Sequence, residues 1–156
     1  MAAKLLIEKM AVDDLPQVMT VEQETLSPWS LPQLEAELQQ TGGWQFVARR
    51  SAGEQIAGYV CGRSVAGEAE IFKIAVVAAQ RCQGIASVLL EHAIQFLAGT
   101  GVTKCYLELR ASNVAAKHLY EKYGFKETAV RKKYYSDPQE DAAVMVKSLM
   151  KEEGVR

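Results

Sequence analysis

The stretch from Ile74 to Leu90 constrains the fold of this chain more than any other. An apolar run at 74–77 is followed by a bend that contains Gly84, and an amphipathic helical pattern begins directly after it. A strand, a tight turn and a helix are predicted in that order. The first turn of such a helix has backbone N–H groups without intrahelical partners, which favour a phosphate together with the helix dipole. A glycine in the bend lets the backbone approach that phosphate closely.

The same strand–turn–helix unit is common in α/β proteins, so the segment by itself is also compatible with an ordinary turn that binds nothing. Two familiar nucleotide sites are not supported. The sequence has no G-x-x-x-x-G-K-[S/T], which is the P-loop pattern, and no G-x-G-x-x-G between a strand and a helix, which is the dinucleotide pattern. If the bend binds phosphate, it is therefore a phosphate site of another kind.

Length and charge limit the classes of protein to which this chain can belong. Its 156 residues fit one domain, which we expect to span 1–156. The 18 Lys and Arg residues balance 19 Asp and Glu residues, so no basic field favours nucleic acid as a partner. No apolar stretch approaches the roughly 20 residues that cross a bilayer, so no membrane partner is expected. The N-terminal sequence lacks the pattern of a signal peptide, and a cytoplasmic protein is the expectation.

The cysteines predict neither a disulfide framework nor a metal site. They form no C-x-x-C pair, and the two histidines, His92 and His118, complete no ligand spacing with them. Cys61 and Cys105 lie in apolar strand patterns and are expected in the core. Cys82 lies in the bend before the predicted helix, a position that lowers the pKa of a thiol in general. The sequence is compatible with either a reactive or an inert thiol at Cys82.

Periodicity and turn residues divide the chain into strands and helices, without repeats or linkers. The predicted strands cover 4–10, 44–50, 55–63, 68–77, 104–110, 125–131 and 142–149, and the predicted helices follow Asp13 or Asp14, Ser30, Gly84 and Asn113. Gly42-Gly43 is expected to end the second helix, and residues 134–141 are expected to separate the last two strands. The order β-α-α-β-β-β-α-β-α-β-β indicates a mixed α/β fold.

A second group of candidate functional residues lies between Glu108 and Tyr120. Glu108 shares one face of its predicted strand with Tyr106 and Arg110, and it lies near the strand end, where functional groups are commonly presented. Asn113 and Tyr120 are seven residues apart, so they nearly coincide around the following helix. A carboxylate and a phenol are therefore predicted close to the phosphate site.

A carboxylate and a phenol suit the acylation of an amine by a thioester. The amine attacks only when it is unprotonated, and a base that takes its proton contributes about 10²- to 10⁴-fold. The leaving thiolate needs a proton, which a tyrosine can donate. An α-amino group has a pKa near ~8 and asks less of the base than a lysine at ~10.4. The structural alternatives are an ion pair between Glu108 and Arg110, and packing of Tyr120 against Leu119 and Tyr123.

Five motifs together resemble one protein family. They are S-P-W-S at 27–30, R-C-Q-G-I-A at 81–86, E-L-R-A-S-N at 108–113, L-Y-E-K-Y-G-F at 119–125 and R-K-K-Y-Y-S-D-P-Q-E-D-A at 131–142. The second motif fits [Q/R]-x-x-G-x-[G/A] and resembles the acetyl-CoA pyrophosphate loop of the GNAT N-acetyltransferases. The order and spacing of all five resemble the ribosomal-protein-alanine N-acetyltransferase (RimI) family, and the resemblance covers nearly the whole chain.

The resemblance implies a GNAT fold, with a mixed sheet of about seven strands and about four helices. It also implies direct transfer of an acetyl group from acetyl-CoA to the N-terminal alanine of a small-subunit ribosomal protein. By matched position, Glu108 would accept a proton and Tyr120 would donate one. The implied acetyl-CoA contacts are Ile74, Ala75, Val76, Cys82, Gln83, Gly84, Ile85, Ala86, Ser87 and Asn113. Trp29, Tyr134 and Tyr135 would wall the acceptor channel.

The sequence departs from the family pattern in and before the loop. Cys82 and Gln83 stand where this family often has arginines, so backbone N–H groups would supply more of the phosphate binding. Val77-Ala78 replaces a frequent Asp-Pro. Two alternatives stay open. One is a GNAT enzyme for another amine, such as a broader range of protein N-termini, a lysine side chain, a polyamine or a drug. The other is a non-catalytic acyl-CoA-binding or ribosome-binding module.

Overall fold

The computed structural model describes residues 4–150. Its strands are β1 (Leu6–Lys9), β2 (Gly43–Arg49), β3 (Ile56–Val65), β4 (Glu68–Val76), β5 (Lys104–Arg110), β6 (Lys126–Tyr135) and β7 (Glu140–Ser148). Its helices are α1 (Leu15–Glu22), α2 (Leu31–Gln39), α3 (Ile85–Gly99) and α4 (Val114–Lys122), with two short 3₁₀ turns, η1 (Val12–Asp14) and η2 (Ala78–Gln80).

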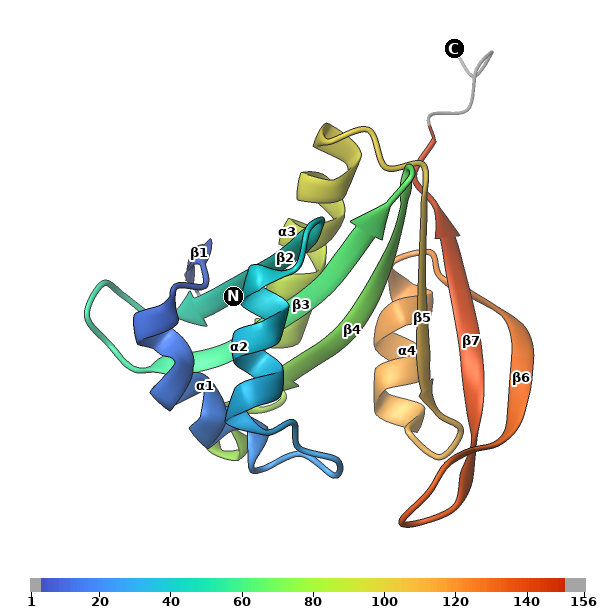
Figure 1. The fold of residues 1–156 in the computed structure, drawn as a ribbon, viewed down its shortest axis with the longest axis horizontal. Coiled ribbons are helices and arrows are strands. Elements are labelled where there is room, and N and C mark those ends of the chain that lie inside the picture. The colour runs from blue at the N-terminus through green and yellow to red at the C-terminus, as the bar shows by residue number, and fades with distance from the viewer. Residues whose placement is uncertain (1–3, 151–156) are drawn as a thin grey trace.

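One seven-stranded sheet organises these elements, in the order β1-β2-β3-β4-β5-β7-β6 (Figure 1). β4 and β5 run parallel, and every other neighbouring pair is antiparallel. A parallel pair needs a long crossover connection, which α3 provides. The last hairpin enters the sheet with β7 beside β5, so β6 forms the edge.

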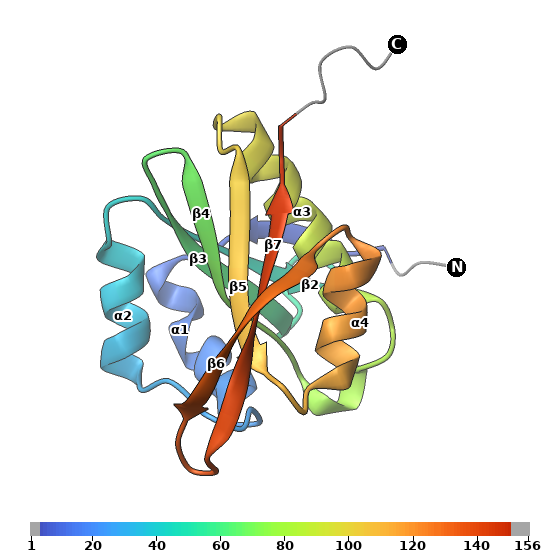
Figure 2. The same cartoon turned by 90° about the vertical axis from the view of Figure 1, so that its right-hand side faces the viewer.

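The helices cover both faces of the sheet. α1 and α2 lie on one face, and α3 and α4 lie on the other (Figures 1 and 2). Each face has its own cluster of buried side chains: Leu89 and Leu107 belong to the larger cluster beneath α3 and α4, and Val18 and Tyr59 belong to the one beneath α1 and α2. Within residues 4–150, no helix is long and apolar enough to cross a membrane.

The parallel strands β4 and β5 are paired along only part of their length. Their register stops at Ile71 opposite Leu107, although both strands continue further. At the same point β4 contains an extra residue, because Ile71 pairs with Gly62 and Lys73 pairs with Cys61 on β3. A bulge of this kind bends its strand and increases the local twist. β4 and β5 therefore diverge towards their carboxyl ends.

The predicted order of seven strands and four helices is confirmed. The alternation predicted for β5 is also confirmed, because Cys105, Leu107 and Leu109 are buried. Ser30 begins α2 with a side-chain oxygen that accepts the N–H of Gln33. A strand period of two and a capping residue are local signals, which explains why the sequence alone carries them.

Three details of the predicted elements are wrong. Residues 134–135 belong to β6, because pairing with β7 extends to Tyr135 opposite Glu140 and leaves only 136–139 as the turn. The second helix ends at Gln39, before Gly42-Gly43. Asp14 precedes α1 but does not cap it, because its carboxylate instead accepts the N–H of Ala11 at 2.7 Å and pairs with Arg49 at 2.7 Å.

Candidate active site

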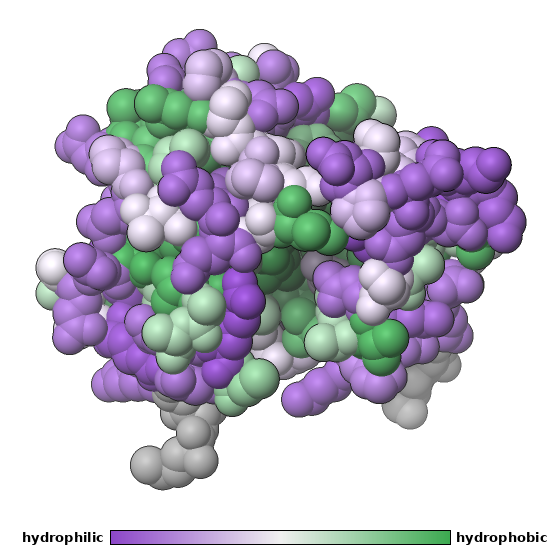
Figure 3. Space-filling model, turned by 90° about the horizontal axis from the view of Figure 1, so that it is seen from below, coloured by the Kyte–Doolittle hydropathy of each residue, from purple (hydrophilic) through white to green (hydrophobic). Residues whose placement is uncertain are grey.

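Two cavities open where β4 and β5 diverge, and they share walls. The cavity on the side of α3 and α4 has a volume of about 370 Å³, and the one on the side of α1 and α2 has about 620 Å³. The residues that line both are Ile74, Val76, Arg81, Ala115, Ala116 and Tyr120. Figure 3 shows apolar residues deep in a hollow with polar residues around it. A ligand can therefore reach from one face of the sheet to the other.

Most residues implied for acetyl-CoA line these cavities. The smaller cavity is lined by Ile74, Val76, Cys82, Gly84, Ile85, Ala86 and Ser87, and the larger one by Ala75 and Asn113. Gln83 lines neither cavity, and its side-chain oxygen accepts a hydrogen bond from Arg50. The structure thus brings together all residues implied for acetyl-CoA except Gln83, which is hydrogen-bonded to the distant Arg50.

The bend before α3 has the backbone shape that the sequence predicts. Gly84 precedes the first helical residue with a φ of +83°, a left-handed conformation that favours glycine. A Cβ added there would meet nothing within 4 Å, so the space in front of the backbone is open. Cys82 is exposed and also left-handed, with a φ of +62°. The Nε of Arg81 donates to the carbonyl of Val76 at 3.1 Å, which ties the bend to the end of β4.

Glu108 projects from β5 into the larger cavity. Its Oε1 pairs with the Nε of Arg131 at 3.3 Å, and its side chain is only 12% exposed. Within the described residues, its Oε2 is buried without a hydrogen-bond partner. The alternative pairing with Arg110 is not found, since Arg110 instead pairs with Glu140 at 3.4 Å. A buried acceptor without a partner is costly for stability and is able to accept a proton or a hydrogen bond from a ligand.

Tyr120 lies on α4 and lines both cavities. Its ring contacts Phe125 edge-on, with the ring centroids 5.6 Å apart, so packing is part of its role. Burial above all raises the pKa of Tyr120, and its hydroxyl therefore stays protonated at neutral pH. A protonated phenol in a cavity can donate a proton to a basic group placed beside it.

Asn113 caps α4 as its sequence position predicts. Its Oδ1 accepts the backbone N–H of Ala116 at 3.2 Å. The residue also lines the larger cavity, beside the helix start. Two contributions are therefore combined at one position, a cap that stabilises the helix and an amide available at the cavity wall.

The three residues implied for the acceptor differ in position. Trp29 and Tyr135 line the larger cavity, whereas Tyr134 does not. The guanidinium of Arg110 lies over the ring of Tyr135, 4.5 Å from its centroid. Burial first and the negative charge of Glu108 second raise the pKa of Tyr135 to about 12. Interaction with the nearby carboxylate of Glu108 is the main cause that raises the pKa of Tyr134.

Sequence reasoning missed a buried charged residue beneath the larger cavity. Glu22 is fully buried at the end of α1. Its Oε2 accepts a hydrogen bond from the Nζ of Lys73 at 2.6 Å, and its Oε1 accepts one from the hydroxyl of Tyr59 at 2.6 Å. A signal was present, because Glu22 follows Leu15 and Val18 on the apolar stripe of the helix. A carboxylate on such a stripe must be paired if it is buried.

Comparison with known proteins gives one family. The model of the acetyltransferase (GNAT) family matches residues 10–125. A [ribosomal protein bS18]-alanine N-acetyltransferase of Escherichia coli K12 is 36% identical over 143 residues, which cover 89% of this chain and 94% of the relative.

Solved structures agree with this match. The crystal structure of the ribosomal-protein-S18-alanine N-acetyltransferase from Escherichia coli superposes with a TM-score of 0.87 at 34% identity, covering 98% of this chain and 99% of that one. NAA60 of Arabidopsis thaliana in complex with acetyl-CoA has a TM-score of 0.83 over 93% of this chain and 98% of that one. At 16% identity, the second likeness shows the fold alone.

The cap of α4 can be separated from any contact that Asn113 makes with a ligand. Asn113→Ala removes the oxygen that accepts the N–H of Ala116, so we expect the free energy of unfolding to fall by about 1 kcal/mol in urea titrations. Asn113→Asp retains an acceptor at the same position and should stay within about 0.5 kcal/mol of the wild type. Equal stability of all three proteins would show that the cap contributes nothing.

Proposed function

The chain belongs to the acetyltransferase (GNAT) family, and from this we propose that it transfers the acetyl group of acetyl-CoA to the N-terminal alanine of a ribosomal protein. The observation that carries the proposal is the joint position of Glu108 and Tyr120 in one cavity at the divergence of β4 and β5. The Escherichia coli relatives supply the class of acceptor, a small-subunit ribosomal protein. We further propose that residues 1–156 form one domain that acts in the cytoplasm, with neither nucleic acid nor membrane as a direct partner.

The proposed acetyl-CoA site uses mainly backbone groups. After Ile71, the edge of β4 that faces β5 has no strand partner, so residues 74–76 can pair with the amide groups of the pantetheine arm. The pyrophosphate would lie against the N–H groups of 82–87, at the positive end of α3. The open space at Gly84 supports this placement. Because the side-chain oxygen of Gln83 already accepts a hydrogen bond from Arg50, the backbone N–H groups rather than the Gln83 side chain would bind the phosphate.

Glu108 and Tyr120 divide the proton transfers of the proposed reaction. Glu108 takes a proton from the α-ammonium group of the acceptor, directly or through one water molecule, and the free amine attacks the thioester carbonyl. The new C–N bond forms and the nitrogen gives up its second proton to water, while the C–S bond breaks and the thiolate leaves with the electron pair of that bond. Tyr120 protonates the thiolate, and its raised pKa supports a phenol that still holds its proton at neutral pH. No covalent acetyl-enzyme is needed.

The acceptor chain would enter from the face that carries α1 and α2. Trp29 and Tyr135 line that side of the cavity, and Tyr134 would reach the site through Glu108. An α-amino group loses its proton near a pH of about 8, so one carboxylate is a sufficient base.

The acceptor class is tested by mass spectrometry with acetyl-CoA and a matched peptide set. One peptide has a free N-terminal alanine followed by basic residues, one has the same terminus blocked but a free lysine, and one begins with methionine. We expect one acetyl group on the first peptide alone. Transfer mainly to the blocked peptide would keep the cofactor and replace the acceptor class. Binding of acetyl-CoA without any transfer would favour the non-catalytic alternative.

The proposed proton acceptor and donor are tested by Glu108→Gln and Tyr120→Phe. Each change keeps the size of the side chain, and each should lower kcat by about 10²- to 10⁴-fold while acetyl-CoA still binds. Tyr123→Phe is the matched control, because Tyr123 is a neighbouring tyrosine that lines neither cavity. Steady-state kinetics with the alanine peptide measure the effect. Wild-type kcat in either site variant would reject that residue's role.

The position of the pyrophosphate is tested by Gly84→Asp. The added carboxylate would occupy the open space before α3 and repel phosphate, so we expect the Kd of acetyl-CoA to rise at least about tenfold, roughly 1.4 kcal/mol. Gly53→Asp is the matched control: Gly53 has a φ of +82°, and an added Cβ there also meets nothing within 4 Å, but it lies in the turn after β2. Isothermal calorimetry distinguishes the two, and equal Kd values would place the pyrophosphate elsewhere.

A further inference from the structure

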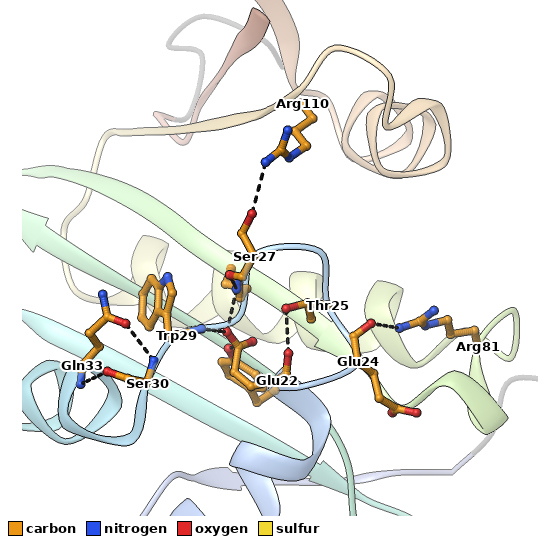
Figure 4. A network of polar contacts seen from close by, with 11 residues as sticks. Glu22, Glu24, Thr25, Ser27, Trp29, Ser30, Gln33, Arg81 and Arg110 are labelled. Atoms are coloured by element: carbon orange, nitrogen blue, oxygen red, sulfur yellow. Dashed lines mark hydrogen bonds and ion pairs between the residues drawn. The ribbon is translucent and has the colours of Figure 1, made fainter. Parts of the chain in front are cut away.

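The loop between α1 and α2, residues 23–30, is attached to both of the diverging strands. From β4, the Nζ of Lys73 donates to the carbonyl of Ser27 at 2.9 Å. From β5, Nη2 of Arg110 donates to the hydroxyl of Ser27 at 3.1 Å. Figure 4 shows the side chains of Arg110 and Ser27 pointing towards one another. One residue of the α1–α2 loop therefore bridges the two strands where they no longer pair.

Glu22 fixes the same loop from beneath. Its Oε2 accepts hydrogen bonds from the Nζ of Lys73 and from the backbone N–H of Trp29, both at 2.6 Å (Figure 4 shows the contact with Trp29). Its Oε1 accepts the hydroxyl of Tyr59, whose pKa burial raises. A buried carboxylate is tolerated only when it is paired in this way, and loss of one partner is costly. Glu22 therefore links the start of the α1–α2 loop to its far end.

Arg110 joins the α1–α2 loop to the opposite wall of the cavity. Its Nη1 donates to the carbonyl of Pro138 at 2.9 Å and lies 3.4 Å from a carboxylate oxygen of Glu140. The backbone N–H of Ser112 donates to the other oxygen of Glu140 at 2.5 Å. The turn between β6 and β7 is thus fixed to the end of β5, and through Arg110 to Ser27.

We propose that the Glu22–Lys73 ion pair is a positioning device that presets the α1–α2 loop for the acceptor peptide. Glu22 lines neither cavity and acts through the loop, whereas Lys73 also lines the larger cavity, so hydrogen exchange in the loop is the measurement that separates loop order from a direct contact of Lys73. The inference rests on the proposed function, because the proposed function assigns the larger cavity to the acceptor peptide. The residues that the loop adds to that cavity are Glu24, Thr25, Leu26, Ser27 and Trp29.

The physical advantage is preorganisation. A loop that is ordered before binding does not lose its conformational freedom when the peptide arrives, so less of the contact energy is consumed. The loop at 82–87, proposed for the pyrophosphate, lies at the start of α3, and neither Glu22 nor Lys73 lines the smaller cavity there. Loss of the pair should therefore raise the KM for the peptide and leave the Kd of acetyl-CoA unchanged.

The test uses the variant Glu22→Gln with Lys73→Met, which removes both charges and leaves no single buried charge. Hydrogen exchange measured by mass spectrometry should become faster in residues 23–30 but not in α3. The KM for the alanine peptide should rise about tenfold, while kcat and the Kd of acetyl-CoA change by less than about threefold. Lys104→Met, at the exposed far end of β5, is the matched control.

A milder variant covers the case in which the double variant does not fold. Ser27→Ala removes only the bond to Arg110, and it should raise the KM of the peptide by about threefold. Unchanged exchange in 23–30, or faster exchange with unchanged KM, would overturn the inference. Faster exchange throughout the molecule with a parallel loss of acetyl-CoA binding would show a structural role and would also overturn it.

Failure of the proposed function has a different signature. If the wild-type protein acetylates another amine, that function is rejected, and the same KM comparison is made with the amine that is used. If the wild-type protein transfers no acetyl group to any amine, the function and the inference fail together, whereas failure of the inference alone leaves wild-type transfer to alanine intact.

Discussion

The early end of pairing between β4 and β5 is the constraint on which the site depends. After Ile71 and Leu107 the two strands share no further register, and the bulge on β4 turns it away. A closed sheet would leave no room for a ligand between these strands, whereas the divergence places a cavity wall on each side. Glu108 and Tyr120 reach the same space only because β5 and α4 border that divergence.

Local chemistry explains what the sequence could predict. Gly84 before α3, the alternation of β5 and the cap at Asn113 depend on residues within one turn or strand, and all three are found. The motifs assigned roles to particular residues only through resemblance to a family, and that family and its fold are confirmed. The end of β6 was misplaced because pairing with β7, rather than local preference, carries that strand to Tyr135.

Side-chain partners were less predictable because they join distant segments. Glu22 and Lys73 are 51 positions apart, and Arg50 and Gln83 are 33 apart. Sequence neighbours suggested that Arg110 would pair with Glu108, since both face the same way on β5. In the fold, β7 brings Glu140 to Arg110, and β6 brings Arg131 to Glu108. Which opposite charge lies nearest is decided by the sheet order, which no local pattern contains.

The attachment of Ser27 to both strands has a mechanical consequence. β4 and β5 are joined by the backbone register up to Ile71 and, beyond it, by the contacts of Lys73 and Arg110 with Ser27. The opening between the two strands is therefore bordered by backbone pairing and also spanned by side-chain contacts. A wider opening between β4 and β5 would require these side-chain contacts to break, so they limit how far the two strands can separate.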